Sequence, residues 1–238
     1  MKKIILSVLL ILLFASHAHA SLNYALLFDG IDDFVKVPDS NSLDLSSGMT
    51  IEAWIKSDLI SDSGARVIVS KWHDPTGEQS YIFKDHNSTP NLRIELSKGG
   101  HNDLADLGGA TSLLTGDWIH VAATYDLNTV NLFYNGALDS SAPPKAPGES
   151  IYNSSTDLLI GTVNPFAGFE TFDGQIDEVR IWNYARTQQQ LQDNRFLALN
   201  GAEDGLMAYW NFDEGTGQTV FDLTINGNHG PTWLNFRY

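Results

Sequence analysis

Short runs of alternating apolar and polar residues, separated by turn residues, recur along most of this 238-residue chain. In "TIEAWIKS" (50–57), Ile51, Ala53 and Ile55 alternate with polar or aromatic neighbours, which is typical of a strand with one buried face. Comparable runs lie at 66–72, 81–84, 91–97, 118–126, 130–136, 157–161, 176–183 and 206–212. About ten short strands predict an all-β protein, an antiparallel two-sheet sandwich of the jelly-roll type.

Only one stretch has the features of a helix. Residues 186–199 are rich in helix formers, and Thr187 and Gln190 have the spacing of a capping box. The apolar content of this stretch is low, which predicts one short surface helix. Residues 140–150 are rich in Pro and Ser and predict a loop, because consecutive prolines do not fit a central strand. No linker divides the chain, so we expect a single domain over 21–238.

The N-terminal residues have the pattern of a signal peptide. Two lysines precede an apolar run at 4–14, and "AHA" ends at Ala20 with the small-x-small pattern of a cleavage site. The apolar run is shorter than the ~20 residues that a membrane-spanning helix needs. We therefore expect cleavage after Ala20, secretion or a periplasmic location, and no insertion into a membrane.

Composition narrows the classes of partner. The chain has no Cys, which excludes disulfides, thiol nucleophiles and zinc thiolate sites. Its formal net charge is −15 at pH 7, which argues against nucleic acid and anionic membranes as partners. The same charge suits divalent cations, or simply solubility.

Three carboxylates lie close together in "FDGIDD", between two strand-like runs. Asp29, Asp32 and Asp33 surround Gly30, which permits a tight turn. Hard cations such as Ca²⁺ take six to eight oxygen ligands from carboxylates, carbonyls and water. An ordinary polar turn would have the same composition, so both interpretations stay open on the residues alone.

A second acidic segment, "FDGQIDEV", repeats the pattern near residue 177. It contains Asp173, Asp177 and Glu178. Asp177 shares its strand parity with Val179 and Ile181, so an inward-facing carboxylate is expected there. A buried carboxylate needs a partner, and no Lys or Arg of the same parity lies nearby. A metal ion would supply that partner.

One loop-rich stretch combines an aromatic ring with hydrogen-bonding groups. "KWHDPTGEQSY" (71–81) contains Trp72, His73, Asp74 and Tyr81, residue types that stack on sugar rings or bind their hydroxyls. These four residues are the predicted ligand-binding group. The alternative is that Trp72 ends a strand and packs in the core.

Five segments together resemble a known family. They are "LLFDGIDDFVKVPDS" (26–40), "SGMTIEAWIKSD" (47–58), "GDWIHVAATYDLNTVNLFYNGAL" (116–138), "FDGQIDEVRIWNYART" (172–187) and "GLMAYWNFDEGTGQTVFDLTINGNHG" (205–230). In this order they resemble a laminin-G-like jelly roll of the concanavalin A-like lectin/glucanase superfamily, related to the pentraxins. The resemblance implies a non-catalytic module that recognises glycans or proteins, and a first strand close to the "IDEVRIW" strand.

The resemblance also implies one structural calcium ion near those two strands. The best candidate ligands are Asp29, Asp32 and Asp177, and Asp33 and Glu178 are the weaker ones. In this interpretation the two acidic segments form halves of one shared site.

Two other functions stay open. Glucanases on this fold carry a Glu-x-Asp-x-x-Glu pattern, but here Gln175 stands at the first position and Arg180 lies near the last. The paired carboxyls of a retaining hydrolase are therefore missing, and we predict no catalytic residues. The second alternative is a protein-interaction or adhesion module without a sugar site. The expected partner is thus a glycan, or a cell-surface or extracellular protein.

Overall fold

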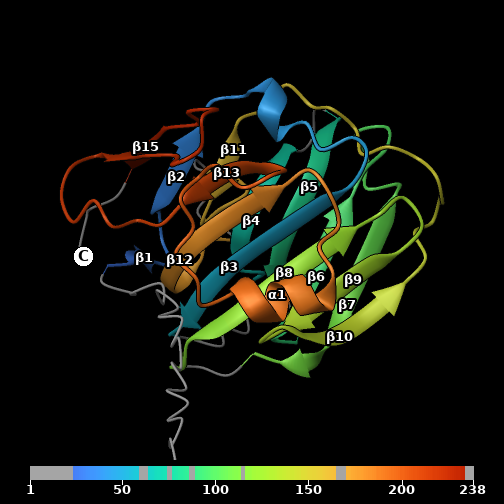
Figure 1. Cartoon of the computed structure of the whole chain (residues 1–238), viewed down its shortest axis with the longest axis horizontal. Helices are drawn as coiled ribbons and strands as arrows, with labels where there is room; N and C mark the ends of the chain where they lie inside the picture. The colour runs from blue at the N-terminus through green and yellow to red at the C-terminus, as the bar shows by residue number, and fades with distance from the viewer. Residues whose placement is uncertain are drawn as a thin grey trace, which may run out of the picture.

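Two β-sheets lie face to face in the computed structural model of the chain (Figure 1). The described residues are 24–58, 64–73, 77–85, 89–113, 116–164 and 170–233. The predicted signal peptide lies outside them. Within these ranges no helix has the length and apolar character that crossing a membrane would need.

The first sheet has seven strands and follows the order β1-β12-β3-β8-β9-β10, with β13 also paired to β12. All its pairings are antiparallel. Its strands are β1 (Leu26–Asp29), β3 (Met49–Ser57), β8 (Ile119–Tyr125), β9 (Val130–Tyr134), β10 (Ala137–Ala142), β12 (Asp173–Trp182) and β13 (Leu206–Trp210).

The second sheet has eight strands in the order β14-β15-β2-β11-β4-β5-β6-β7. Its pairings are antiparallel as well. Its strands are β2 (Phe34–Val37), β4 (Val67–His73), β5 (Glu78–Asp85), β6 (Asn91–Leu96), β7 (Ala105–Ser112), β11 (Leu158–Ile160), β14 (Thr219–Val220) and β15 (Gly230–Trp233). The predicted antiparallel sandwich is confirmed.

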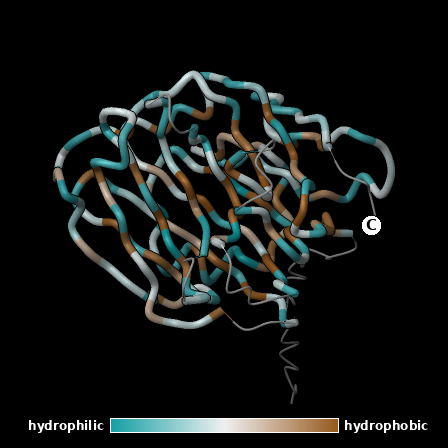
Figure 2. Tube along the Cα trace, turned by 180° about the vertical axis from the view of Figure 1, so that it is seen from behind, coloured by the Kyte–Doolittle hydropathy of each residue, from teal (hydrophilic) through white to brown (hydrophobic). Residues whose placement is uncertain are grey.

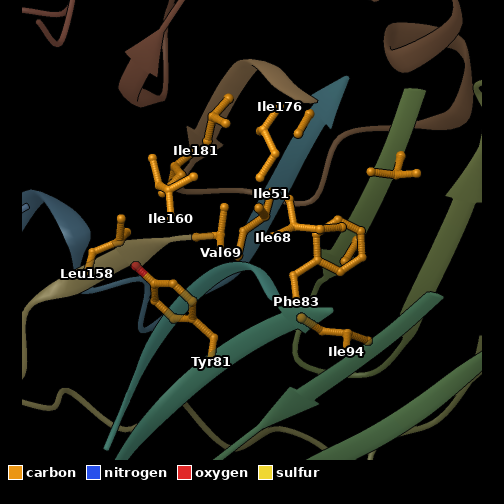
Figure 3. Packing of buried hydrophobic residues seen from close by; sticks show 14 of the residues in the cluster. Ile51, Ile68, Val69, Tyr81, Phe83, Ile94, Leu158, Ile160, Ile176 and Ile181 are labelled. Carbon is orange, nitrogen blue, oxygen red and sulfur yellow. The ribbon is translucent and has the colours of Figure 1, made fainter. Parts of the chain in front are cut away.

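The main core fills the space between the two sheets. Ile51 and Ile176 project from the seven-stranded sheet toward Val69, Phe83 and Ile160 of the other sheet, and all five are fully or almost fully buried (Figure 3). Burying such side chains stabilises the fold by ~1.5–3 kcal/mol each. Seen from behind, short hydrophobic and hydrophilic segments alternate along the strands, as a half-buried sheet requires (Figure 2).

The single α-helix among the described residues, α1 (Gln188–Asn194), covers part of the outer face of the seven-stranded sheet (Figure 1). The predicted capping box forms: the Gln190 backbone NH donates to Thr187 Oγ1 at 3.2 Å, and the Thr187 NH donates to Gln190 Oε1 at 2.9 Å. Leu191 is the buried residue of the helix and packs on Ala122 and Phe133. The helix is short because a single apolar side chain anchors it.

Some strands were not expected from the sequence. β7 contains two adjacent glycines, and β10 overlaps the start of the predicted 140–150 loop. Both are terminal strands of their sheets, where turn-forming residues are tolerated. A short 3₁₀-helix, η1 (Asn41–Leu43), follows β2.

The C-terminal segment closes the domain. β13 pairs with β12, whereas β15 pairs with β2 in the opposite sheet. β1 and β2 likewise belong to different sheets, so "FDGIDD" crosses from one sheet to the other and does not form a hairpin.

Candidate functional site

Two adjoining hollows lie over the outer face of the eight-stranded sheet. The first, of about 300 Å³, contains Lys84 and is called the Lys84 hollow. The second, of about 290 Å³, contains Lys36 and is called the Lys36 hollow. Both are lined by Trp72, His73, Val163 and Asn164. Because they share these residues, the two hollows form one feature, here named the Trp72 groove.

The position of Trp72 follows from an irregularity in the β4–β5 pairing. The register shifts between Lys71 and Trp72, so the two side chains are not placed by simple alternation. Lys71 is fully buried and its Nζ lies 2.7 Å from Asp39 Oδ1. Trp72 packs with Val67, Ile82 and Val163 in a small cluster separate from the main core. This cluster is the apolar floor of the groove.

Charged side chains surround the floor of the Lys84 hollow. Lys84 Nζ lies 3.2 Å from Glu95 Oε1 and 3.6 Å from Glu170 Oε1. Glu95 Oε2 also accepts a hydrogen bond of 2.8 Å from Asn102 Nδ2. Asn102 Oδ1 is buried and has no hydrogen-bond donor among the described residues.

The Lys36 hollow is polar on one side and apolar on the other. Lys36 Nζ forms an ion pair of 2.8 Å with Asp157 Oδ2. Ser155 and Thr156 line the same side, whereas Leu159 is buried beneath. Such a mixture of apolar floor and polar walls is typical of small-molecule sites.

A tight contact between two glycines holds one rim of the groove. Gly100 has φ +85° and Gly77 has φ +78°. A Cβ added at Gly100 would lie 1.9 Å from the Gly77 carbonyl oxygen, so no other residue fits there. The same loop is held by Asp103, whose Oδ1 accepts the backbone NH groups of Lys98 at 2.8 Å and Gly99 at 3.1 Å.

The predicted ligand-binding residues divide into two groups. Trp72 and His73 line both hollows, and His73 is exposed. Tyr81 faces the main core, where it is fully buried and its hydroxyl donates to the Leu43 carbonyl at 3.2 Å (Figure 3). The prediction of a ligand contact at Tyr81 is therefore wrong, because alternation along β5 directs it inward. Asp74 lies outside the described residues.

Several groove residues were missed by sequence reasoning. Lys84 and Glu95 lie on the consecutive strands β5 and β6, Asn102 lies between β6 and β7, and Glu170 comes from a distant segment just before β12. The alternation of Ile82 and Lys84 with core residues was a usable signal for an outer face at β5. Nothing in the sequence indicated that Glu170 would reach the same place.

The acidic turn gathers three of the predicted metal ligands and separates them from the others. Asp29, Asp32 and Asp33 each offer a carboxylate oxygen within 4.8 Å of the other two. Asp29 Oδ1 accepts the Ile31 NH at 2.9 Å, and Asp33 Oδ2 accepts the Asp29 NH at 2.9 Å. Asp33, treated as a weaker candidate, is the buried member of this group.

The cross-strand partner of Asp29 is Asp173, with which it forms the last pair of the β1–β12 ladder. Burial raises the pKa of Asp173, and the neighbouring Asp58 and Asp29 carboxylates act in the same direction. Gly30, at φ +73°, brings the turn close to Asp173: an added Cβ would lie 3.0 Å from the Asp173 Cβ. The turn is therefore strongly anionic.

Asp177 lies at the other end of this ladder. Its register partner is Trp54, and Leu26 pairs with the preceding Ile176. Asp177 is 1% exposed, and its Oδ1 accepts the Glu178 NH at 2.7 Å. Burial, together with the nearby Glu178 and Asp213 carboxylates, raises the pKa of Asp177 to about 8. The expected burial of Asp177 is confirmed.

The parity argument for Asp177 is wrong, because the β12–β3 register shifts between Asp177 and Arg180. Ile176 and Val179, three residues apart, both face the core, so Asp177 faces away from it. Glu178 occupies this bulge with φ +53°. Its carboxylate binds Arg180 and accepts the Tyr209 hydroxyl at 2.8 Å.

The donor atoms of the acidic turn fit a hard cation. They are all oxygens, they are anionic, and their spacing allows contact with a single ion of the size of Ca²⁺. Glu178 does not fit, because Arg180 and Tyr209 already occupy its carboxylate. The single site expected from both acidic segments is thus divided between the two ends of the β1–β12 ladder.

Comparisons with known proteins agree with this architecture. A family model described as the concanavalin A-like lectin/glucanases superfamily matches residues 29–192. Mouse pappalysin-1 is 24% identical over 154 residues, which cover 60% of this chain and 9% of pappalysin-1. The chain therefore spans only a small part of that relative.

Solved structures with a similar fold are also known. A Bacteroides ovatus protein, provisionally assigned as carbohydrate-binding, superposes with a TM-score of 0.70 at 25% identity, covering 88% of this chain and 58% of that chain. The CBM40 of Ruminococcus gnavus IT-sialidase, bound to α2,3-sialyllactose, has a TM-score of 0.56 at 14% identity. That match covers 74% of this chain and 98% of the CBM40.

Proposed function

This chain belongs to the concanavalin A-like lectin/glucanases superfamily, and on that premise we propose that it is a non-catalytic module that binds glycans in the Trp72 groove. The observation that carries the proposal is the groove itself, with an apolar floor at Trp72 and polar groups around it. Sugars present apolar ring faces and hydroxyl edges, so they need this combination.

Individual polar side chains of the groove can form hydrogen bonds with a bound sugar. The Glu95 and Glu170 carboxylates, which line the Lys84 hollow, can accept hydrogen bonds from sugar hydroxyls. His73, exposed beside Trp72, lines both hollows and can donate or accept. Carbohydrate binding is also the provisional assignment of the Bacteroides ovatus protein, which supports the proposal.

A glycan array followed by calorimetry tests this function. We expect at least one glycan to bind, and His73→Ala to weaken that binding at least about tenfold, or ~1.4 kcal/mol. The control is Lys56→Ala, on the seven-stranded sheet, which should bind like the unmodified protein. Equal binding by His73→Ala and the unmodified protein would place the ligand elsewhere.

A module for protein interaction or adhesion is the second candidate. Exposed apolar side chains near the C-terminus favour it: Phe221 is 49% exposed, Leu223 42% and Ile225 99%. Silence across the array, with a protein partner recovered in pull-downs, would support this function. Release of reducing sugar from β-glucans would instead establish a hydrolase.

We further propose that a structural Ca²⁺ binds at the acidic turn through Asp29, Asp32 and Asp33. Their oxygen spacing supports this position better than the originally expected set with Asp177 and Glu178. The ion would neutralise the repulsion among the carboxylates and stabilise the crossover between the sheets. Export through a signal peptide ending at Ala20 is also part of the proposal, and N-terminal sequencing of the mature protein tests it.

A further inference from the structure

Two carboxylates share Lys84, the one Lys or Arg side chain that lines the Lys84 hollow among the residues that the structure describes. Lys84 Nζ lies 3.2 Å from Glu95 Oε1 and 3.6 Å from Glu170 Oε1, and its side chain is 10% exposed. Two acids around one lysine leave the hollow with an excess of negative charge. A lysine held in this way is not free to bind an incoming anion.

The neighbouring cations are paired as well. Arg93, adjacent on the same sheet, binds Glu95 through Nε at 3.0 Å and Asp106 through Nη2 at 2.6 Å. In the Lys36 hollow, Lys36 Nζ lies 2.8 Å from Asp157 Oδ2. Lys36 and Lys84 are the only Lys or Arg side chains among the described residues that line the groove. Each of them already has a carboxylate partner.

The groove as a whole is therefore acidic. Its described lining holds two lysines and three acids, Glu95, Asp157 and Glu170. The formal net charge of the chain, −15, adds a repulsive field of the same sign. A glycan carboxylate or sulfate would either face these acids or displace one of them from its lysine, and both outcomes are unfavourable.

We propose that the Trp72 groove selects uncharged glycans and rejects glycans that carry a carboxylate or sulfate. This inference rests on the proposed glycan-binding function and adds the class of ligand to it. The acids that repel an anion also accept hydrogen bonds from hydroxyls, so the same groups serve an uncharged sugar.

The fold alone does not impose this selectivity. The Ruminococcus gnavus CBM40 has a similar fold and is bound to sialyllactose, a glycan with a carboxylate. The distinction in our protein arises from the ion pairs of Lys84 and Lys36. It is therefore a property of this chain's own side chains.

The test uses an array of uncharged, sialylated, uronic-acid and sulfated glycans, followed by calorimetry on a matched pair. The pair is the best uncharged oligosaccharide and the same oligosaccharide with its primary hydroxyls oxidised to carboxylates. We expect the oxidised form to bind at least about tenfold more weakly. The difference should shrink at high salt, because salt screens repulsion.

Variants assign the effect to the groove. The double variant Glu170→Gln, Asp157→Asn removes two of the three acids. It should reduce the ratio of the two Kd values, oxidised over uncharged oligosaccharide, so that the logarithm of this ratio falls to half or less of its value in the unmodified protein. The control, Asp117→Asn with Asp204→Asn, makes the same change in net charge at exposed positions outside the groove. It should leave the ratio nearly unchanged.

The outcomes separate the two proposals. Equal or tighter binding of the oxidised glycan by the unmodified protein overturns the selectivity and leaves glycan binding intact. An equal change of the ratio in the groove and control variants overturns the role of the paired lysines. Silence across the whole array overturns the glycan-binding function, and the selectivity with it.

Discussion

Asp29 faces Asp173 across the β1–β12 ladder, whereas Asp177 faces Trp54 on the opposite neighbour of β12. Because Leu26 pairs with Ile176, the position level with Asp177 on this side is 25. It lies four positions before Asp29, or roughly 13 Å away at ~3.3 Å per residue. The two acidic segments are therefore neighbours in the sheet, but their Asp29 and Asp177 carboxylates do not meet.

Calcium should stabilise the protein through the acidic turn. We expect added Ca²⁺ to raise Tm and a chelator to lower it, by ~2–4 °C for each kcal/mol of binding free energy. Asp32→Asn should abolish this shift, and the exposed Asp204→Asn should keep it. Differential scanning calorimetry measures both. Loss of the shift in Asp177→Asn, with Asp32→Asn unaffected, would move the ion to Asp177 and Asp213.

The effects of Asp29→Ala and Asp177→Ala on unfolding free energy should add. Sites more than ~7–10 Å apart without shared partners are usually additive within ~0.5 kcal/mol. Urea denaturation of the two single variants and the double variant measures the coupling. A coupling well above 0.5 kcal/mol would restore a single shared site.

The titration of Asp177 should make stability fall as pH rises. Its folded pKa is about 8, against an ordinary value of 3.8, so between these values the folded state holds a proton that the unfolded state has released. The contribution is complete below pH 4 and is lost as pH rises through about 8, at up to ~1.4 kcal/mol per pH unit. Asp177→Asn should flatten this slope in urea titrations with chelator present. An unchanged slope would contradict the assignment.

Glu52 should contribute strongly to the free energy of unfolding, through its contacts on the outer face of the seven-stranded sheet. It is fully buried and accepts hydrogen bonds from Arg186 Nη1 at 2.6 Å and Trp182 Nε1 at 2.8 Å. Glu52→Gln leaves buried cations without a counter-charge and should cost ~3–5 kcal/mol of unfolding free energy. The exposed Glu149→Gln should cost less than ~0.5 kcal/mol. Urea denaturation at pH 7 compares the two.

The pH dependence of Glu52 has the opposite sign to that of Asp177. Burial alone would raise the pKa of Glu52, but the hydrogen bond from His120 and the charge of Arg180 outweigh it and hold that pKa at about 2. Its stabilising contribution is present above about pH 4.5 and is lost as pH falls through about 2. Glu52→Gln should therefore reduce the pH dependence of stability in acid.

Tyr81 should affect stability and not binding. Tyr81→Phe removes the hydrogen bond to the Leu43 carbonyl and should cost ~1 kcal/mol. Its glycan Kd should stay within about twofold of the unmodified value, because the side chain faces the main core. Calorimetry beside His73→Ala measures the contrast. A tenfold higher Kd for Tyr81→Phe would show that Tyr81 does contribute to ligand binding.

Local patterns in the sequence determined most of the fold. Period-two alternation identified β3 and its core residues, and the capping-box spacing identified α1, because both depend on residues close together in the chain. The family could also be recognised, since several such segments occur in a fixed order. The sequence predicted that Asp177 is buried, because it alternates with Val179 and Ile181. The bulge in β12 breaks this alternation, and Asp177 is buried on the other face of the sheet.

Only the tertiary structure decided which side chains meet. The register shift at Trp72 places this ring beside Lys84 and Glu170, which come from segments far apart in the chain. Register likewise assigns Asp173, and not Asp177, to Asp29. Alternation along one strand fixes which face a residue occupies, but bulges and strand pairing are set by packing between distant segments. The chain thus specified a sandwich locally, and packing assembled its groove and its acidic turn.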